Sequence, residues 1–454
     1  MTDSPIKVKK FLLLLGDLII LYFSLWLTLY FRYWPNFNPS LWQQHWLPFT
    51  FIYFIWLIIF YISGLYDLNL AKNTLKFYSI LFKSLAISAG VAILFFYLIP
   101  YFGIAPKTNL VLNLLIFTLL LSGWRQAFNR LIKSPVLLSN VLIIGQNKEI
   151  DQIVKYISAN LQLGYYIKKI ISEEETRLVF NLIEIVIKEK IQTIVTVRDP
   201  RRDGTLVRNL YHCLPLKITL YDLPSFYERI TGKIPISIIE EIWFLENLMI
   251  SQKNIYENFK RGFDFFLALI LGFLTLPFYP LVAMLIKLDS SGPIFIKQQR
   301  VGQDNRIFKV IKFRSMYSLT PDGTAEKNGA LWATKNDPRI TKIGNFLRKT
   351  RIDELPQLFN IIKGEMSFVG PRPERPEFVF GTNMERKIPF YQIRHLVKPG
   401  LTGWAQIKFQ YGASYEDTME KLQYDFYYLK NRSFLLDLTI ILKTIKIILS
   451  GGGR

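Results

Sequence analysis

Residues 353–374 read DELPQLFNIIKGEMSFVGPRPE, and this stretch decides how the C-terminal part of the chain is interpreted. Two adjacent carboxylates, Asp353 and Glu354, precede apolar residues at helical spacing, and Gly364 is a typical helix end. Arg372 follows in a turn between two prolines. The stretch therefore predicts a short helix that begins at two carboxylates and ends before a rigid turn that carries an Arg.

Asp353 has two compatible interpretations. Asp is a favoured N-cap residue, and Pro356 is acceptable in a first helical turn, so a plain structural cap explains the pattern. A carboxylate at a helix N-terminus also stays ionised, because backbone N–H groups and the helix dipole favour negative charge there. An ionised Asp353 can attack phosphorus, and Glu354 beside it can help to hold a divalent cation. The residues alone leave both interpretations open.

The first third of the chain contains four long apolar stretches. They lie near Phe11–Phe31, Trp46–Tyr66, Tyr78–Tyr101 and Leu110–Trp124. The clearest approach the roughly 20 residues that cross a bilayer, so we expect four transmembrane helices. Lys and Arg gather before the first stretch, after the second and after the fourth. This distribution places the N-terminus, the middle connection and everything after Arg125 in the cytoplasm.

Asp17 lies inside the first of these apolar stretches. An ionisable residue at such a depth is expensive to bury and therefore has a reason to be there. A functional intramembrane acid and a polar contact between packed helices are both open interpretations.

From Pro135 to about Glu241 short apolar runs alternate with amphipathic ones. The pattern predicts strands at Val136–Gly145, Ile191–Val197 and Leu216–Tyr221, and helices near Ile150–Asn160 and Thr176–Lys188. Such alternation favours a small Rossmann-like α/β domain with a parallel sheet. Gln146 and Asn147 follow Gly145 and no further Gly lies nearby, so the dinucleotide-binding fingerprint is missing. We expect a regulatory or assembly module here.

A fifth apolar stretch runs from Gly262 to Leu288 and is long enough to cross a membrane. Basic residues flank both of its ends, and Pro277 and Pro280 interrupt it, where proline removes helix hydrogen bonds and bends the axis. A true crossing would move the acid-bearing C-terminal region outside the cell. We therefore expect a re-entrant helix at about 262–288 that bends near Pro277 and returns to the same face.

Composition limits the classes of function. The 454 residues are 50% hydrophobic and carry a formal net charge of +21, which calls for an anionic partner such as lipid headgroups, a phosphorylated substrate or nucleic acid. Cys213 is the only cysteine, which excludes an intrachain disulfide and a thiolate zinc cluster. Any metal is expected to be a hard cation on oxygen ligands. A non-catalytic membrane-tethered nucleotide- or nucleic-acid-binding protein is the alternative, although no recognition helix or RNA-binding motif supports nucleic acid.

Residues 290–316 interleave glycine-bearing turns with Lys and Arg. Charge-assisted hydrogen bonds from such groups suit a diphosphate. A solvated basic face explains the same composition, so both interpretations stay open for any one of these residues.

An ordered series of motifs extends through the C-terminal region. It comprises Lys260-Arg261-x-x-Asp264, the Pro277 break, Gly292-Pro293, Lys312-Phe313-Arg314-Ser315-Met316, Asp353–Asn360, Gly370-Pro371-Arg372-Pro373, Arg394-His395 and Pro399–Trp404. On these motifs the sequence from about Lys260 to Arg454 resembles the bacterial sugar transferase family, the monotopic polyprenyl-phosphate phosphoglycosyl transferases. With its N-terminal segments and middle domain, the whole chain resembles the large subgroup that includes undecaprenyl-phosphate galactose phosphotransferase. Lys398 stands where an Arg is common, which makes phosphate binding there less bidentate.

The resemblance implies an undecaprenyl-phosphate hexose-1-phosphate transferase. Such an enzyme moves a sugar 1-phosphate, with galactose or glucose as the sugar, from a UDP-sugar to undecaprenyl phosphate and releases UMP. The step would open exopolysaccharide, capsule or O-antigen synthesis at the cytoplasmic face of the bacterial inner membrane. The implied site has Asp353 as the nucleophile that becomes a phospho-Asp, Glu354 as a ligand of Mg²⁺, and Lys312, Arg314, Arg348, Arg372 and Arg394 as phosphate contacts. Pro277 would fix the membrane hairpin.

The expected architecture is therefore membrane α plus α/β. Residues 1–134 would form the four-helix transmembrane region, 135–250 the Rossmann-like domain, and 251–454 the catalytic domain anchored by the re-entrant helix. The lipid bilayer, a UDP-sugar and polyprenyl phosphate are the expected partners, and nucleic acid is not. A homodimer is allowed, with the oligomeric state left open.

Overall fold

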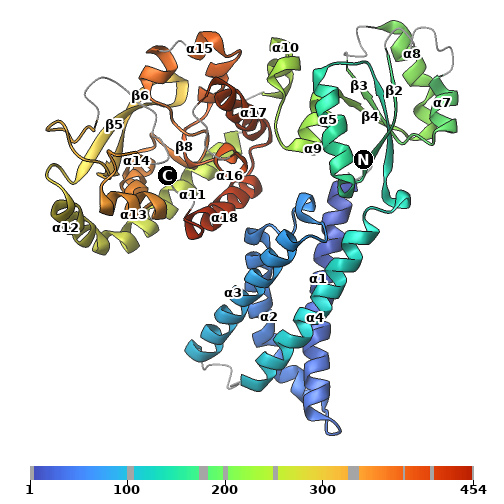
Figure 1. Ribbon diagram of the computed structural model, residues 1–454, viewed down its shortest axis with the longest axis horizontal. Coiled ribbons are helices and arrows are strands. Elements are labelled where there is room, and N and C mark those ends of the chain that lie inside the picture. Colours follow the sequence, from blue (N-terminus) through green and yellow to red (C-terminus); the bar gives the residue numbers. More distant parts are fainter. Residues whose placement is uncertain are drawn as a thin grey trace. The chain divides into compact units, whose positions relative to one another are not determined.

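The computed structural model describes residues 5–99, 107–172, 182–197, 203–248, 254–325, 337–381, 384–409 and 414–451. The chain divides into two compact units, Met1–Phe226 and Tyr227–Arg454 (Figure 1). Helix α9, Leu223–Thr231, crosses from one unit into the next.

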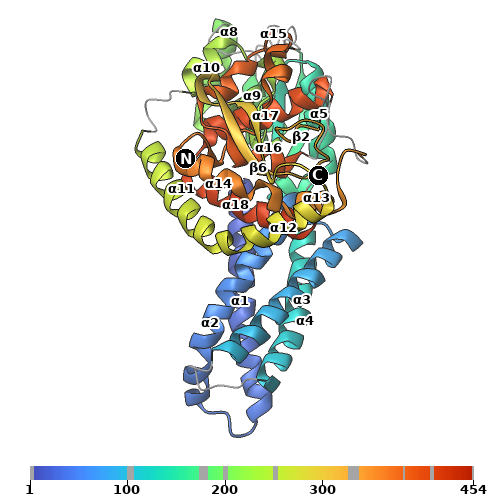
Figure 2. The ribbon, with the colours of Figure 1, turned by 90° about the vertical axis from the view of Figure 1, so that its left-hand side faces the viewer.

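Four long helices form the N-terminal part of the first unit. They are α1 (Pro5–Tyr33), α2 (Pro39–Ser63), α3 (Leu75–Leu98) and α4 (Lys107–Leu131), and they lie side by side as a bundle (Figure 2). Each is long and apolar enough to cross a membrane. Leu25, Trp56, Phe60 and Phe117 are fully buried among them. The four predicted apolar segments are confirmed as helices; the end of the third prediction, at Tyr101, lies outside the described residues.

A buried ion pair joins α1 to α4. The Arg125 guanidinium donates to a carboxylate oxygen of Asp17, and its other Nη donates to the Leu65 carbonyl at 2.7 Å. Farther along the same two helices, the Asn113 amide donates to Ser24 Oγ at 3.1 Å. Of the two interpretations of Asp17, the structure shows the polar contact between packed helices.

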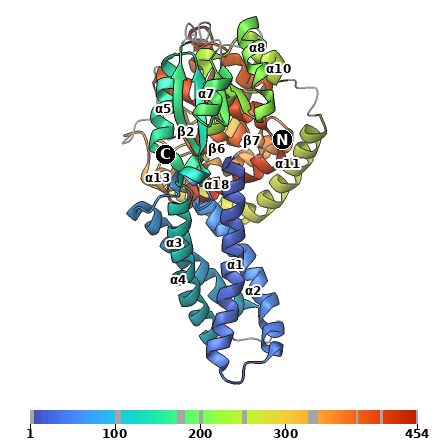
Figure 3. The ribbon, with the colours of Figure 1, turned by 90° about the vertical axis from the view of Figure 1, so that its right-hand side faces the viewer.

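A four-stranded parallel sheet in the order β2-β1-β3-β4 completes the first unit (Figure 3). Its strands are β1 (Ser139–Ile144), β2 (Tyr165–Ile171), β3 (Thr193–Thr196) and β4 (Thr219–Asp222), and α5 (Lys148–Ala159), α7 (Leu182–Lys188) and α8 (Gly204–His212) connect them. The expected α/β region is therefore present. Strand β2 was not predicted, because Lys168 and Lys169 interrupt its apolar run at the edge of the sheet. The predicted helix Thr176–Lys188 is present over α7, and its first six residues, 176–181, lie outside the described residues.

The sheet domain is tied to the ends of the helix bundle. Lys9 on α1 donates to the Ile132 carbonyl at 2.9 Å, and Lys72 donates to the Ala159 carbonyl at 2.9 Å. The Tyr156 hydroxyl donates to Asn69 at 3.1 Å. These contacts explain why the bundle and the sheet belong to one compact unit.

The second unit carries the fifth apolar segment. Helix α11 (Asn254–Thr275) is followed by the 3-10 turn η9 (Leu276–Phe278) and by α12 (Tyr279–Asp289). Pro277 lies in that turn, where the segment bends (Figure 2). Only 11% of an apolar 18-residue stretch within Ile255–Asp289 is buried, and Phe273 is 79% exposed. The segment is thus a fifth candidate for a membrane helix, with a bend at the predicted proline.

The second unit contains these further main elements. They are α10 (Glu241–Asn247), the hairpin β5 (Phe295–Val301) and β6 (Ile307–Phe313), α13 (Lys342–Thr350), η11 (Ile352–Gln357), α14 (Leu358–Lys363), β7 (Ser367–Val369), the π-helical turn η12 (Glu377–Gly381), α15 (Met384–Lys387), η13 (Tyr391–Leu396), β8 (Gly400–Thr402), α16 (Trp404–Lys408), α17 (Tyr415–Asn431) and α18 (Phe434–Leu449). Strands β7 and β8 pair in parallel. Ala268 of α11, Ile361 of α14 and Ile440 of α18 meet in one buried core. The core therefore packs the apolar helix directly against the elements that follow the two carboxylates.

Candidate active site

Asp353 and Glu354 lie in the 3-10 turn η11, which runs straight into α14. Arg351, the residue before this turn, has φ +61° in the left-handed region and also ends α13. Gly364, with φ +86°, ends α14 as predicted. The interpretation of Asp353 as an N-cap is wrong, because Arg351 occupies the cap position and the turn begins one residue before Asp353.

Three cationic side chains converge on Glu354. Its Oε1 accepts from Lys312 Nζ at 3.3 Å and from Arg372 Nη2 at 3.1 Å, and its Oε2 accepts from Arg351 Nη1 at 3.2 Å. The three cations come from β6, from the proline-flanked turn after β7 and from the end of α13. Burial by itself would raise the pKa of Glu354, but Arg372, Lys312 and Arg351 outweigh it and hold that pKa well below its usual range. Glu354 is therefore firmly ionised.

Asp353 has a different environment although it is the next residue. It is 8% exposed, and its Oδ1 is buried without a hydrogen-bond partner. Burial, followed by the negative charge of Glu354, raises the pKa of Asp353 to about 6, against the opposing charges of Lys312, Arg348 and Arg351. Asp353 is thus mostly ionised at neutral pH yet has an oxygen with no partner. Two neighbouring carboxyls whose pKa values are driven apart suit different chemical roles.

Lys312 is the third ionisable group of the site whose pKa is shifted, after Asp353 and Glu354. Burial lowers its pKa to about 8, while Glu354 opposes that decrease. Lys312 is on the antiparallel hairpin, and Asn360 of α14 fastens that strand by accepting from the Ile311 N–H at 3.1 Å and donating to the Lys309 carbonyl at 2.8 Å. The position of the Lys312 ammonium therefore depends on Asn360, seven residues after Asp353.

Arg394 lies behind Arg372 instead of beside the carboxylates. Its guanidinium donates to the Arg372 carbonyl at 3.1 Å and to the Tyr391 hydroxyl at 2.9 Å, and it pairs with Asp425 at 2.9 Å. Arg394 and Asp425 are both buried. Arg394 thus supports the backbone of the residue whose side chain contacts Glu354.

Arg314 is placed elsewhere. It is buried and donates to the backbone carbonyls of Ser290 at 2.7 Å, Ile286 at 3.3 Å and Ser291, all at the end of α12. Strand β6 ends one residue earlier, so Arg314 no longer shares the face of Lys312. A cation is favourable at a helix C-terminus, so this Arg holds the end of the second half of the apolar segment.

Of the predicted site residues, the structure brings together Asp353, Glu354, Lys312 and Arg372, with Arg348 on α13 acting on Asp353 through its charge. Pro277 lies apart, in the bend. Arg351 was missed. Its position two residues before Asp353 was the available signal, but its left-handed conformation, which turns its side chain toward Glu354, is not visible in the sequence.

A divalent cation is the implied cofactor of this site. Among the described residues no group of three or more His, Cys, Asp or Glu side chains gathers as a metal cage. Mg²⁺ is commonly held by one or two carboxylates together with substrate phosphates and water. The carboxylate pair fits that pattern, because both donors are hard oxygens and Asp353 Oδ1 has no hydrogen-bond partner.

The second unit thus combines a carboxylate pair among partly buried cations with a long exposed apolar helix, which suits an anionic substrate at a membrane surface. Residues 255–451, all in this unit, match the model of the family described as bacterial sugar transferase. The exopolysaccharide production protein PSS of Rhizobium leguminosarum bv. phaseoli is 41% identical over 189 residues, which are 41% of this chain and 92% of that protein. The chain belongs to the bacterial sugar transferase family.

Two longer relatives carry names that state a reaction. The UDP-N-acetylgalactosamine-undecaprenyl-phosphate N-acetylgalactosaminephosphotransferase of Aeromonas hydrophila is 43% identical over 260 residues, 57% of this chain and 59% of that protein. The UDP-glucose:undecaprenyl-phosphate glucose-1-phosphate transferase of Escherichia coli (strain K12) is 41% identical over 190 residues, 41% of this chain and 39% of that protein. The matched part thus spans less than two thirds of either relative.

Proposed function

We propose that this protein transfers a sugar 1-phosphate from a UDP-sugar to a polyprenyl phosphate, most simply undecaprenyl phosphate, and releases UMP. The observation that carries the proposal is the Asp353–Glu354 pair, whose pKa values are driven in opposite directions within a group of partly buried cations. Family membership and the reactions in the names of the relatives support the donor and the acceptor.

In the first step Asp353 acts as the nucleophile. An ionised carboxylate oxygen attacks the phosphorus bonded to the sugar, the phosphoanhydride bond to the uridine phosphate breaks, and UMP leaves with that bonding pair. Asp353 then carries the sugar phosphate as an acyl phosphate. Its unpartnered Oδ1 supports this role, because no hydrogen bond has to be broken before attack.

In the second step a phosphate oxygen of the polyprenyl phosphate attacks the same phosphorus. The bond to Asp353 breaks, the free carboxylate returns, and the product is a polyprenyl-diphospho-sugar. One phosphoanhydride has replaced another, so the overall reaction is near balanced and needs no external energy source.

The cations around Glu354 stabilise the charge that develops on phosphorus. Lys312 and Arg372 hold donors in fixed positions in a partly buried site, where such donors act more strongly than in water. Arg348 adds its charge beside Asp353. Glu354, with oxygens of the diphosphate, would hold the implied Mg²⁺, which supplies further neutralisation of those oxygens when bound.

The bent apolar segment would bring this site to the bilayer surface. Exposed apolar side chains along α11 and α12, the bend at Pro277 and basic residues at both ends support a hairpin that enters and leaves by the cytoplasmic face. The lipid phosphate of the acceptor lies at headgroup level, within reach of a site seated there.

The sugar is proposed as a hexose or an N-acetylhexosamine, since relatives are named for glucose and for N-acetylgalactosamine. This extends the expectation of galactose or glucose. The transfer would open the synthesis of a surface polysaccharide.

Purified full-length protein with Mg²⁺ and undecaprenyl phosphate tests the proposal against UDP-galactose, UDP-glucose, UDP-N-acetylgalactosamine and UDP-N-acetylglucosamine. UMP release is expected with at least one donor, and Asp353→Asn should abolish it. Release of no UMP with any donor, or full activity of Asp353→Asn, would overturn the assignment.

A further inference from the structure

The start of the apolar helix α11 carries a polar stripe that the proposed reaction does not use. Tyr256, Lys260 and Asp264 are four residues apart and therefore share one helix face. Lys260 is 8% exposed and Asp264 is 3% exposed. Charged groups are rarely buried at the base of an apolar helix unless they hold something in place.

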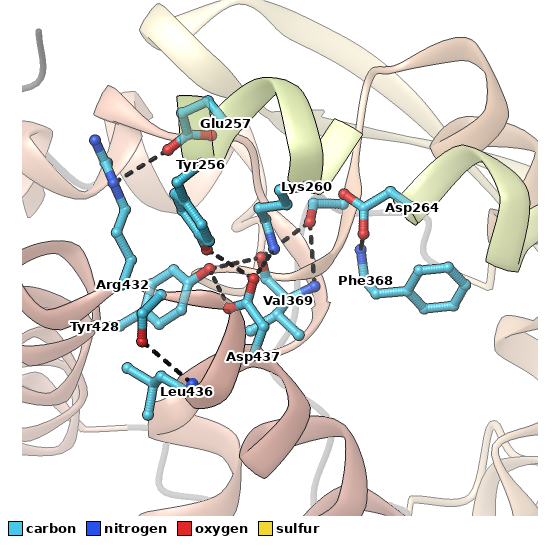
Figure 4. Close-up of polar contacts among 12 residues, drawn as sticks. Tyr256, Glu257, Lys260, Asp264, Phe368, Val369, Tyr428, Arg432, Leu436 and Asp437 are labelled. Atoms are coloured by element: carbon cyan, nitrogen blue, oxygen red, sulfur yellow. Dashed lines mark hydrogen bonds and ion pairs between the residues drawn. The ribbon is translucent and has the colours of Figure 1, made fainter. Parts of the chain in front are cut away.

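The first two residues of the stripe fasten α11 to α18. Lys260 Nζ donates to Asp437 Oδ2 at 2.6 Å, and the Tyr256 hydroxyl donates to the same oxygen at 2.7 Å (Figure 4). Asp437 Oδ1 accepts from the Tyr428 hydroxyl of α17 at 2.9 Å. Asp437 is thus saturated by three donors from two helices.

The third residue of the stripe holds β7. Asp264 Oδ1 accepts from the Phe368 backbone N–H at 3.3 Å, and the Tyr428 hydroxyl reaches the Val369 carbonyl at 3.1 Å (Figure 4). Val369 ends this strand, and Arg372 follows three residues later. The approach of Arg372 to Glu354 therefore starts from a strand that α11 positions.

Arg261, the residue after Lys260, holds α14, which is on the Glu354 side of the contact between Arg372 and Glu354. Its Nη1 donates to the Ile361 carbonyl at 2.6 Å and its Nη2 donates to the Ile362 carbonyl at 2.7 Å. These carbonyls belong to the last turn of α14, the helix that continues from the turn bearing Glu354. A two-pronged guanidinium at a helix C-terminus fixes both the position and the rotation of that helix.

We propose that Arg261 and Asp264 are positioning residues that set the contact between Arg372 and Glu354, because one turn of the apolar helix holds both segments that meet there. The seating of α11 is thereby transmitted to the reacting groups. This proposal rests on the proposed function only for its kinetic readout. The mechanical link, by which Arg261 and Asp264 of α11 hold α14 and β7, is tested separately.

The kinetic test compares Arg261→Gln with Arg261→Lys, and Asp264→Leu with Asp264→Asn. Each of the non-conservative variants is expected to lower kcat roughly 10- to 100-fold, since a shift of about 1 Å at reacting groups costs that much. The conservative variants should recover part of the loss. Glu257→Gln is the matched control, because Glu257 is on the same helix, is 41% exposed and pairs with Arg432 away from α14 and β7. It should keep the wild-type kcat.

A double-mutant cycle separates positioning from a general loss of folded protein. If Arg261 acts through Arg372, then Arg261→Gln in an Arg372→Gln background should change kcat far less than it does in the wild type. Equal fold losses in both backgrounds would overturn the proposal.

Hydrogen exchange gives a readout that does not need the reaction. Arg261→Gln should speed amide exchange in residues 358–363, and Asp264→Leu in residues 367–369, whereas Glu257→Gln should not. Unchanged exchange in both variants would refute the link between α11 and the site. If the wild type releases no UMP but the two variants show these exchange changes, the proposed function is overturned and the mechanical link remains supported.

Discussion

The proposed reaction should depend on pH through two groups of the candidate site, Asp353 and Lys312. Burial and the charge of Glu354 raise the pKa of Asp353 to about 6, and burial lowers the pKa of Lys312 to about 8. The nucleophile must be deprotonated, so activity is lost as the pH falls through about 6. The Lys312 ammonium must be protonated to stabilise phosphate charge, so activity is lost as the pH rises through about 8.

The expected profile of kcat/KM for the UDP-sugar is therefore bell-shaped, with its maximum near pH 7. One pH unit below the pKa of Asp353, or one pH unit above the pKa of Lys312, about a tenth of that group is in the protonation state that the reaction needs. The value of kcat/KM should therefore fall about tenfold near pH 5 and near pH 9. The profile is measured by UMP release at donor concentrations below KM, with the protein in vesicles and the acceptor in excess.

The variant Lys312→Arg isolates the alkaline limb. A guanidinium stays protonated over this range, so the variant should lose that limb and keep the acid one, whatever its absolute rate. A flat profile between about pH 5 and pH 9, or an alkaline limb that persists in Lys312→Arg, would refute the assignment of these two groups.

Four further outcomes are expected. Incubation with the UDP-sugar donor in the absence of polyprenyl phosphate should leave one sugar phosphate on Asp353, detected as an added mass that Asp353→Asn does not gain; a labelled Asp353→Asn protein would contradict the nucleophile. Chelation of divalent cations should stop UMP release and added Mg²⁺ should restore it, whereas full activity in the chelator would contradict a metal at Glu354. Lys260→Met should destabilise the second unit by about 3–5 kcal/mol because Asp437 is left as an uncompensated buried charge, and the double variant Lys260→Met/Asp437→Leu should recover part of that in thermal unfolding. A reporter fused after Arg454 should be cytoplasmic in the wild type, and a periplasmic signal would show that the fifth apolar segment crosses the membrane.

Much of the architecture was predictable because apolar length and periodicity depend only on local sequence. The four N-terminal helices and the bend at Pro277 follow from runs of apolar residues and one proline. Strand β2 was not predictable by the same rule, since an edge strand needs only part of its surface buried and Lys168 and Lys169 conceal its pattern. The other edge strand, β4, was predicted because no charged residue interrupts its apolar run, so it is the Lys pair and not the edge position alone that concealed β2.

The site was predictable in its residues and less so in their arrangement. The motif Lys312–Met316 contains two basic residues that the sequence does not distinguish. In the structure Lys312 contacts Glu354, whereas Arg314 donates to carbonyls at the end of α12. The difference arises because β6 ends between them, a boundary that the sequence does not mark. Arg394 likewise acts through the Arg372 backbone, which depends on contacts between segments far apart in the chain.

A comparison of the buried acids of the second unit supports the proposal that Asp353 is the nucleophile. Asp337 pairs with Arg339 at 2.6 Å, and Asp437 accepts from Lys260 at 2.6 Å and from two tyrosines. Glu354 accepts from three cations. Asp353 is as deeply buried as these, but its Oδ1 has no hydrogen-bond partner; Oδ2 of Asp425 also lacks a hydrogen bond but is ion-paired with Arg394 at 2.9 Å. Leaving a buried charged oxygen unpaired costs stability. A functional role, in which a substrate or ion provides the missing partner, is one explanation for such a group. Lys312, Arg348 and Arg351 favour the ionised form of Asp353 against burial and the charge of Glu354, and the unpartnered Oδ1 is the oxygen that would attack phosphorus in the proposed reaction.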